Sequence, residues 1–210
     1  MVVTKSKAKY QYNAEPRLSA NQLAEYLTAS PTRRKSIIKD ARFPRTIVVA
    51  RYDVARTAIA GFLADPMRKV SILTDAIDDL LIRETKETAS TWMQGDSRLS
   101  SEAIKAFHAT QGQLGLGKMD FRRITKKKPK LLIRGVEISV SLDVTTHRPN
   151  KGAPDSVGGL VLVLSKSEQS IKARLERCKT IAVLAAMFAA DHLDYLGSGP
   201  INFLADHTIP

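Results

Sequence analysis

Hydrophobic and polar residues alternate most clearly in the second half of the chain. From Val136 to Val144 every second residue is aliphatic, and the residues between them are polar, ending with Asp143. A period of two predicts a β-strand with one buried face. The consecutive apolar residues 160–164 predict a second strand that is covered on both faces. A loop that contains Pro and Gly, 145–159, is expected to connect the two strands.

Apolar residues elsewhere recur every three or four positions, which is the period of an amphipathic α-helix. Ser19 and Gln22 form a capping-box pattern at the start of the first helix, and Pro31 ends it or starts the next. We expect helices across 43–90, another at 101–111, and a long one at 167–195. The predicted buried faces are Tyr52, Ala55, Ile59, Phe62 and Leu63; Ile72, Leu73, Ile77, Leu80 and Leu81; and Ile171, Leu175, Cys178, Ile181, Leu184, Ala185 and Phe188.

These patterns predict an α/β (α+β) fold, in which a small mixed sheet flanked by helices follows a helical N-terminal half. Residues 1–16 are expected to form a flexible basic arm, and residues 17–210 a single domain. Within that domain, 17–117 is expected to be mainly helical, and 118–210 to hold the strands, the long helix and the C-terminal tail. A hydrophobic content of 43% is high enough for such a chain to fold.

Three features bear on cellular location. The apolar run 181–190 is too short to span a bilayer, and the N-terminus has no apolar segment of the kind found in secretory signals. Cys178 is the only cysteine, which excludes an internal disulfide and is typical of a reducing compartment. We therefore expect a cytoplasmic protein that does not enter a membrane.

Positive charge is concentrated in two segments. The net charge is +12, and residues 1–45 and 118–134 each carry +7. Concentrated positive charge is typical of proteins that bind a polyanion, and a solvated basic surface is the alternative. We expect a nucleic-acid partner, with DNA favoured over RNA, held through its phosphates. The expected nucleic-acid-binding residues are Arg33, Arg34, Lys35, Arg122, Arg123, Lys126, Lys127, Lys128, Lys130, Arg174 and Arg177.

The segments GVEISVSLD and GLVLVLSK together resemble the core of the PD-(D/E)XK nuclease superfamily, in its RecB-like branch. In that family one strand carries a metal-binding Asp, and the next carries an acid, one spacer residue and a Lys. Asp143 and Lys166 match the first and last of these positions. The resemblance implies that they are the catalytic positions of a nuclease-like core, and that Asp143 binds Mg²⁺ or Mn²⁺ if the enzyme is active.

The chain departs from the family at Leu164, where the motif requires Asp or Glu. An aliphatic side chain has no lone pair for a hard cation, so the motif retains a single carboxylate. We therefore expect a nucleic-acid-binding protein with a degenerate active site that has lost cleavage and has no cofactor. The resemblance implies work in DNA or RNA processing or phage defence, with a larger nucleoprotein or defence complex as a further partner.

Two other functions are compatible with the sequence. The first is an active Mg²⁺- or Mn²⁺-dependent nuclease that combines Asp143 and Lys166 with a migrated acid. Candidates for that acid are Glu168, Glu84, Glu87 and Glu102. The second is a structural or interaction subunit of a larger complex, whose basic segments contact an acidic protein.

Overall fold

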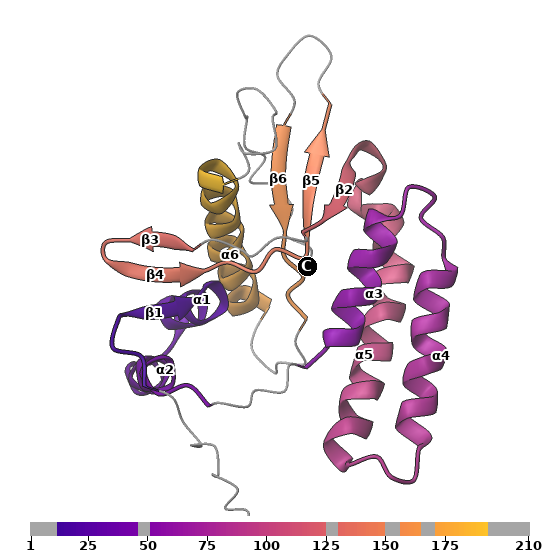
Figure 1. Ribbon diagram of the computed structural model, residues 1–210, viewed down its shortest axis with the longest axis horizontal. Coiled ribbons are helices and arrows are strands. Elements are labelled where there is room, and N and C mark those ends of the chain that lie inside the picture. Colours follow the sequence, from indigo (N-terminus) through magenta and orange to yellow (C-terminus); the bar gives the residue numbers. More distant parts are fainter. Residues whose placement is uncertain (1–11, 46–50, 125–129, 150–155, 165–170, 193–210) are drawn as a thin grey trace, which may run out of the picture.

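The computed structural model describes residues 12–45, 51–124, 130–149, 156–164 and 171–192. This part of the chain is a mixed α/β fold with six α-helices and two three-stranded sheets (Figure 1). The elements are β1 (Arg17–Ser19), α1 (Ala20–Thr28), α2 (Pro31–Arg42), α3 (Asp53–Ala64), α4 (Ser71–Thr85), α5 (Thr91–Thr110), the 3-10 helices η1 (Gln111–Leu114) and η2 (Leu116–Lys118), β2 (Asp120–Arg123), β3 (Leu131–Ile133), β4 (Val136–Ser139), β5 (Val144–Arg148), β6 (Ser156–Leu160) and α6 (Ile171–His192). The predicted α/β class is confirmed at this level, whereas the nuclease-like core stays a prediction.

The two sheets have different topologies. In the first, with order β1-β4-β3, β1 runs parallel to β4 and β3 runs antiparallel to it. The β3–β4 hairpin turns at Arg134 and Gly135, both with positive φ, which is the backbone that a two-residue hairpin turn requires. In the second sheet, with order β2-β5-β6, every pairing is antiparallel.

The predicted strand from Val136 to Val144 is wrong as a single element. The structure divides it into β4 and the start of β5, which belong to different sheets. The alternation in burial still holds across the junction, since Ile138, Val140 and Leu142 are each about 1% exposed. The alternation of buried and exposed side chains therefore continues across the position where the chain leaves one sheet and enters the other. Only the strand pairing shows that two strands are present.

The predicted second strand at 160–164 is also displaced. β6 covers Ser156–Leu160, and together with β5 it occupies much of the expected loop 145–159. Two of the glycines that suggested a loop, Gly158 and Gly159, are strand residues. A Cβ on Gly159 would overlap Leu142 Cδ1, and one on Gly158 would lie 2.9 Å from Thr146 Oγ1. Glycine inside a strand here marks a close approach by a neighbouring side chain.

The predicted start of the first helix is confirmed in detail. Ser19 is the N-cap of α1, where its hydroxyl accepts from the Gln22 N–H at 3.1 Å. The Gln22 side chain in turn accepts from the Ser19 N–H at 2.9 Å, which completes the capping box. Pro31 is the first residue of α2, with Ser30 as its N-cap.

Other helix predictions are confirmed in part. The expected buried face of α3 is correct, and Leu73 and Leu80 of α4 are 1% exposed, but Leu81 is 57% exposed. The helix expected at 101–111 is much longer, because α5 begins at Thr91. In α6 the predicted face holds from Ile181 to Phe188 and fails at its start, where Ile171 is 72% exposed.

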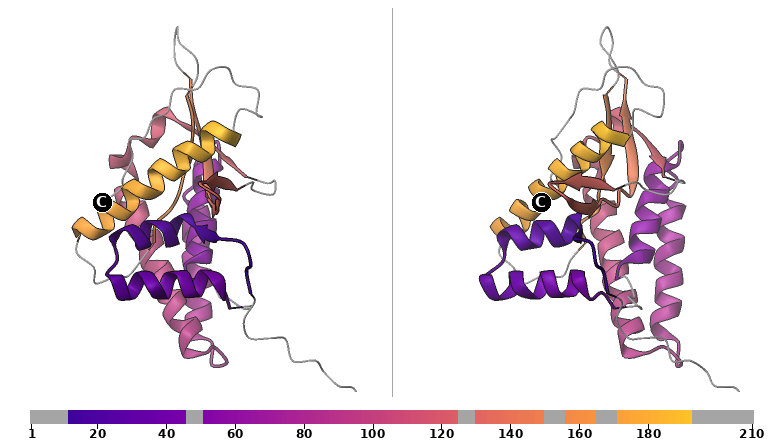
Figure 2. Two further views of the ribbon diagram at one scale, coloured as in Figure 1. Left: turned by 90° about the vertical axis from the view of Figure 1, so that its left-hand side faces the viewer. Right: turned by 60° about the vertical axis from the view of Figure 1, so that its left-hand side comes forward.

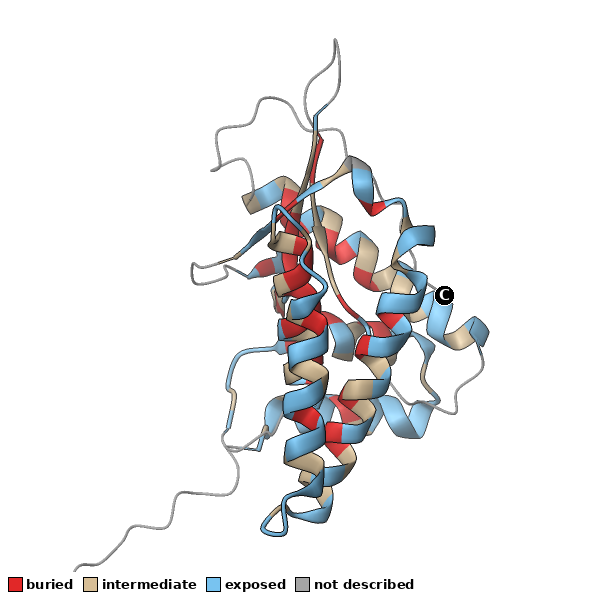
Figure 3. Cartoon of the chain, turned by 90° about the vertical axis from the view of Figure 1, so that its right-hand side faces the viewer, coloured by how far each residue is buried: buried red, intermediate tan, exposed pale blue. Residues whose placement is uncertain are grey.

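Two hydrophobic cores hold the fold together. One is formed mainly by α3, α4, α5 and the second sheet, and the other by α1, α2, the first sheet and α6. Helix α6 contacts α1, β3 and β6, so it joins the two parts (Figures 1 and 2). Figure 3 shows the buried residues along the inner sides of the helices and the sheet. None of the helices in the described ranges is long and apolar enough to cross a membrane.

Candidate functional site

Asp143 lies at the junction between the two sheets, where its carboxylate accepts three hydrogen bonds and its N–H donates a fourth. Arg56 of α3 donates from Nε to Oδ1 at 3.0 Å and from Nη2 to Oδ2 at 2.9 Å. The Leu162 N–H donates to Oδ2 at 2.7 Å, and the Asp143 N–H donates to the Leu160 carbonyl at 2.9 Å. The Asp143 side chain is 9% exposed. One carboxylate thus connects α3, the start of β5 and the segment after β6.

This arrangement does not fit a Mg²⁺ site in which Asp143 is a ligand. Hard cations need several oxygen ligands, and a bidentate arginine competes directly for both carboxylate oxygens. Leu164 packs against the core around α3 and supplies no oxygen. Lys166, the other predicted catalytic position, lies outside the described residues, as does Glu168. The expected pairing of Asp143 with Lys166 is therefore untested, and the observed partner is Arg56.

The other acids proposed as metal ligands lie apart from Asp143 in the fold. Glu84 is in the last turn of α4, Glu87 follows that helix, and Glu102 is on α5. Among the described residues, no three His, Cys, Asp or Glu side chains come together as a metal site.

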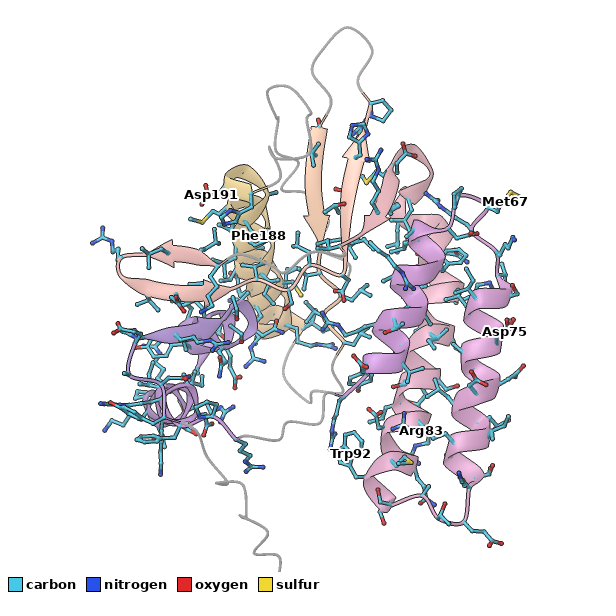
Figure 4. The ribbon with its side chains drawn as sticks, in the orientation of Figure 1. Met67, Asp75, Arg83, Trp92, Phe188 and Asp191 are labelled. Carbon is cyan, nitrogen blue, oxygen red and sulfur yellow. The ribbon has the colours of Figure 1, made fainter. Side chains whose placement is uncertain are left out.

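Asp96 is a buried acid that no sequence pattern singled out. Its side chain accepts from the Tyr52 N–H at 2.9 Å and lies 3.7 Å from Arg83. Figure 4 shows Arg83 on α4 between that helix and α5, while Asp75 points outward. Asp96 therefore stabilises the N-terminus of α3 and the packing of the three helices. A single acid within a helical pattern carries no signal of such a role.

Basic residues from distant parts of the sequence converge at the C-terminal end of α1. Arg33 of α2 and Arg177 of α6 both contact Glu25, at 2.8 and 3.3 Å. Arg34 donates to the carbonyls of Tyr26 and Leu27, at 3.0 and 3.3 Å. The hydrogen bond and the charge of Glu25 raise the pKa of Arg33. Arg174 lies one turn before Arg177 on α6, so it is placed on the same side of that helix. We call Arg33, Arg34, Arg174 and Arg177 the arginine cluster.

The remaining predicted nucleic-acid-binding residues are not part of that cluster. Arg122 and Arg123 are exposed on β2, beside α3, and Arg123 donates to the Thr57 carbonyl at 3.1 Å. Lys130 forms an ion pair with Glu137 across the β3–β4 hairpin. Lys35 is exposed on α2. Residues 126–128 lie outside the described ranges. In Figure 1, β2 and α2 lie on opposite sides of the β5–β6 hairpin.

A cavity of about 890 Å³ lies between α5, α6 and the β5–β6 hairpin. Its walls are mainly apolar, and they include Leu164, at the position where the nuclease motif has an acid. Sequence patterns did not indicate this cavity, because its wall residues come from helices, strands and connecting segments that are far apart in the sequence. Cys178 also lines it, and burial raises the pKa of the thiol while Arg174 lowers it.

No family model, curated protein or solved structure matches this chain. The resemblance to RecB-like nucleases therefore rests on the two sequence segments alone. Any function has to be argued from the residues themselves.

Proposed function

We propose that the protein binds nucleic acid, DNA rather than RNA, through the phosphate backbone, and that it does not use Asp143 to cleave it. The observation that carries this proposal is the arginine cluster, in which Arg33 and Arg177 share one acid, Glu25, and Arg34 donates only to backbone carbonyls. Glu25, together with Asp40 near Arg33, supplies fewer negative charges than the four arginines supply positive ones, so the surface keeps an excess of positive charge. A nucleic-acid phosphate is a partner of the matching charge.

The hydrogen-bonding capacity of arginine supports this role. A guanidinium has five N–H donors in a planar fork, and each cluster arginine uses only some of them in the contacts described. The Arg33 side chain is 49% exposed, and Arg174 forms no ion pair within the described part of the chain. Donors therefore remain for bidentate contacts to phosphate oxygens.

The contacts of Asp143 support the second half of the proposal. Both of its oxygens accept from Arg56, and Leu164 offers no ligand two positions before Lys166. A nuclease-like fold in which the first acid has become a structural contact can still bind nucleic acid through basic residues elsewhere. Work within a larger nucleoprotein or defence complex belongs to the same proposal and rests on the resemblance alone.

The test is the salt dependence of binding to a labelled DNA duplex. Lys35→Ala and Arg174→Ala together remove two exposed charges that make no ion pair among the described residues, so the fold should survive. The slope of log K against log salt is negative, and each lost phosphate contact reduces its magnitude by about 0.9. The slope of the double variant should therefore be shallower by about 1.8.

The matched control is Lys86→Ala with Arg98→Ala, which removes the same two residue types from two exposed positions, one directly after α4 and one within the N-terminal half of α5. This control should retain the slope of the natural protein. Equal slopes in the two double variants would show that neither Arg174 of the arginine cluster nor the exposed Lys35 contacts phosphate, which would contradict the proposed surface.

A further inference from the structure

The cavity beside β5 and β6 has one face made by the sheet. In the antiparallel register Thr146 is opposite Gly158, and Arg148 is opposite Ser156. Residues opposite one another share a face, and so do residues two apart on one strand. All four line the cavity, as does Leu160, which belongs to the same face. The Arg148 side chain is therefore on the cavity side of the sheet.

Small side chains on two helices keep this space open. Helix α5 contributes Ala103 and Ala106, and α6 contributes Ala182 and Ala186. Each pair is separated by three or four residues, so each forms a stripe on one face of its helix. On the sheet, Gly158 adds no side chain at all. Larger residues at these five positions would fill much of the volume.

The cavity is elongated and its chemistry differs between its ends. On α5 it extends from Leu99 to Thr110, which is about 16 Å of helix. Arg148 and Ser156 lie at the end of the hairpin where β5 and β6 meet the connecting loop. Past the other end of β6, the lining continues with the apolar residues 161–164. One end is thus basic and polar, and the other is aliphatic.

Arg148 is half-buried, and its side chain forms no ion pair or hydrogen bond with another described residue. Glu102, the acid that also lines the cavity, is exposed to solvent. A partly desolvated guanidinium attracts an anion. Apolar walls at the other end bind hydrocarbon, because burying apolar surface there is favourable.

We propose that this cavity binds a small amphipathic molecule with one alkyl or acyl chain and an anionic head group. The head group contacts Arg148, and the chain lies between α5 and α6 toward Leu164. A volume of about 890 Å³ is within the range of roughly 300–1,000 Å³ that is typical of small-molecule sites. The Leu164 side chain, which departs from the nuclease motif, is here an apolar wall. No residue of the arginine cluster lines the cavity, although Arg174 lies near Cys178 in its wall.

The experiment is a calorimetric titration of the full-length protein with four probes that share one chain. They are dodecanoate, dodecyl phosphate, dodecanol and dodecyltrimethylammonium. The two anions should bind with a Kd at least tenfold lower than that of dodecanol, and the cation should bind most weakly. The anions should also raise the unfolding temperature, since they bind the folded state. The difference between the carboxylate and the phosphate then distinguishes the two kinds of head group.

Variants test both ends of the cavity. Arg148→Met keeps the length of the side chain and removes its charge, so it should raise the Kd of both anions at least tenfold and leave that of dodecanol unchanged. Arg17→Met, an exposed arginine in the other sheet, is the matched control and should change neither. Ala182→Phe fills the cavity from α6 and should abolish binding of every probe. Ala103→Phe fills it from α5 and replaces Ala182→Phe if that variant does not fold.

Three results would overturn the proposal. The first is the absence of binding by any probe. The second is equal affinity for dodecanoate and dodecanol, or an Arg148→Met variant that binds both as the natural protein does. The third is binding that persists in a folded Phe variant, which would place the probes on another surface.

Discussion

The contact between Arg56 and Asp143 makes a sharp prediction about stability. Replacing Asp143 with Ala leaves the Arg56 guanidinium and the Leu162 N–H without their shared acceptor. Breaking a buried ion pair costs about 3–5 kcal/mol, and Arg56 is 27% exposed and recovers some hydration. We therefore expect Asp143→Ala to lower the free energy of unfolding by about 3 kcal/mol. About 1 kcal/mol of this comes from the Leu162 N–H, which loses its hydrogen-bond acceptor.

Urea denaturation measures this loss. With a slope of about 2–3 kcal/mol per molar urea, the midpoint should fall by about 1–1.5 M. Asp143→Asn keeps an acceptor for Leu162 but loses the charge, so it should cost roughly half as much. Because Arg56→Met removes the same interaction, the double variant Arg56→Met, Asp143→Ala should be much less destabilised than the sum of the two single variants.

An exposed ion pair on α6 provides the control. Lys179 and Glu176 lie 3.0 Å apart, with side chains 57% and 49% exposed. Glu176→Ala should cost less than about 0.5 kcal/mol, because exposed pairs contribute little. If Asp143→Ala were as mild as Glu176→Ala, or if it stabilised the protein, Asp143 would not be a structural contact. Stabilisation in particular is what a strained metal ligand would show when removed.

Two further predictions concern packing and titration. Gly159→Ala places a Cβ against Leu142 and should lower the free energy of unfolding by about 1–3 kcal/mol. Gly95→Ala lies on α5 with open space around it and should raise the free energy of unfolding by about 0.5–1 kcal/mol. Equal effects of the two substitutions would contradict the close approach at Gly159. Burial raises the pKa of Cys178, so its alkylation by iodoacetamide should reach half its maximal rate at a pH above that of free cysteine, and Arg174→Ala should move this pH higher still. As pH rises, the unfolded chain loses the thiol proton before the folded protein does. The contribution of Cys178 to stability is therefore present below the pKa of the unfolded chain and is lost as pH rises above it. A thiol that reacts below the pH of free cysteine would contradict the conclusion that burial raises its pKa.

Local signals in the sequence predicted local structure well. The capping box at Ser19 and Gln22, the helix start at Pro31 and the buried face of α3 each depend on residues within one or two helical turns. The alternation that ends at Val144 also reported burial correctly. These features need no knowledge of which strand or helix lies beside them.

Features that depend on distant partners could not be predicted. The chain changes sheets after Ser139 because β4 and β5 pair with different strands. β4 pairs with β1, more than a hundred residues away in the sequence, and β5 pairs with β2, about twenty residues away. In the same way, no local pattern predicted that Asp143 contacts Arg56, which is 87 residues away. Residue type showed that Asp143 was important, but only the fold shows what it contacts.

The cavity follows the same logic. Each alanine in its walls is a common helix residue, and the glycines of β6 resembled a loop. Only their meeting in space makes an elongated site with Arg148 at one end and Leu164 near the other. The departure from the nuclease motif at Leu164 then has a physical reason, since an acid there would place a charge in an apolar wall.

Incubation of the full-length protein with a labelled DNA duplex in the presence and absence of Mn²⁺ tests the central claim most directly. Both the bound fraction and the integrity of the strand are followed over time. We predict that the duplex is bound, that binding weakens steeply as salt is raised, and that the strand stays intact with or without the metal. Cleavage that requires Mn²⁺ and is abolished by a folded Asp143→Asn variant would contradict this account, and so would a duplex that is not bound at low salt.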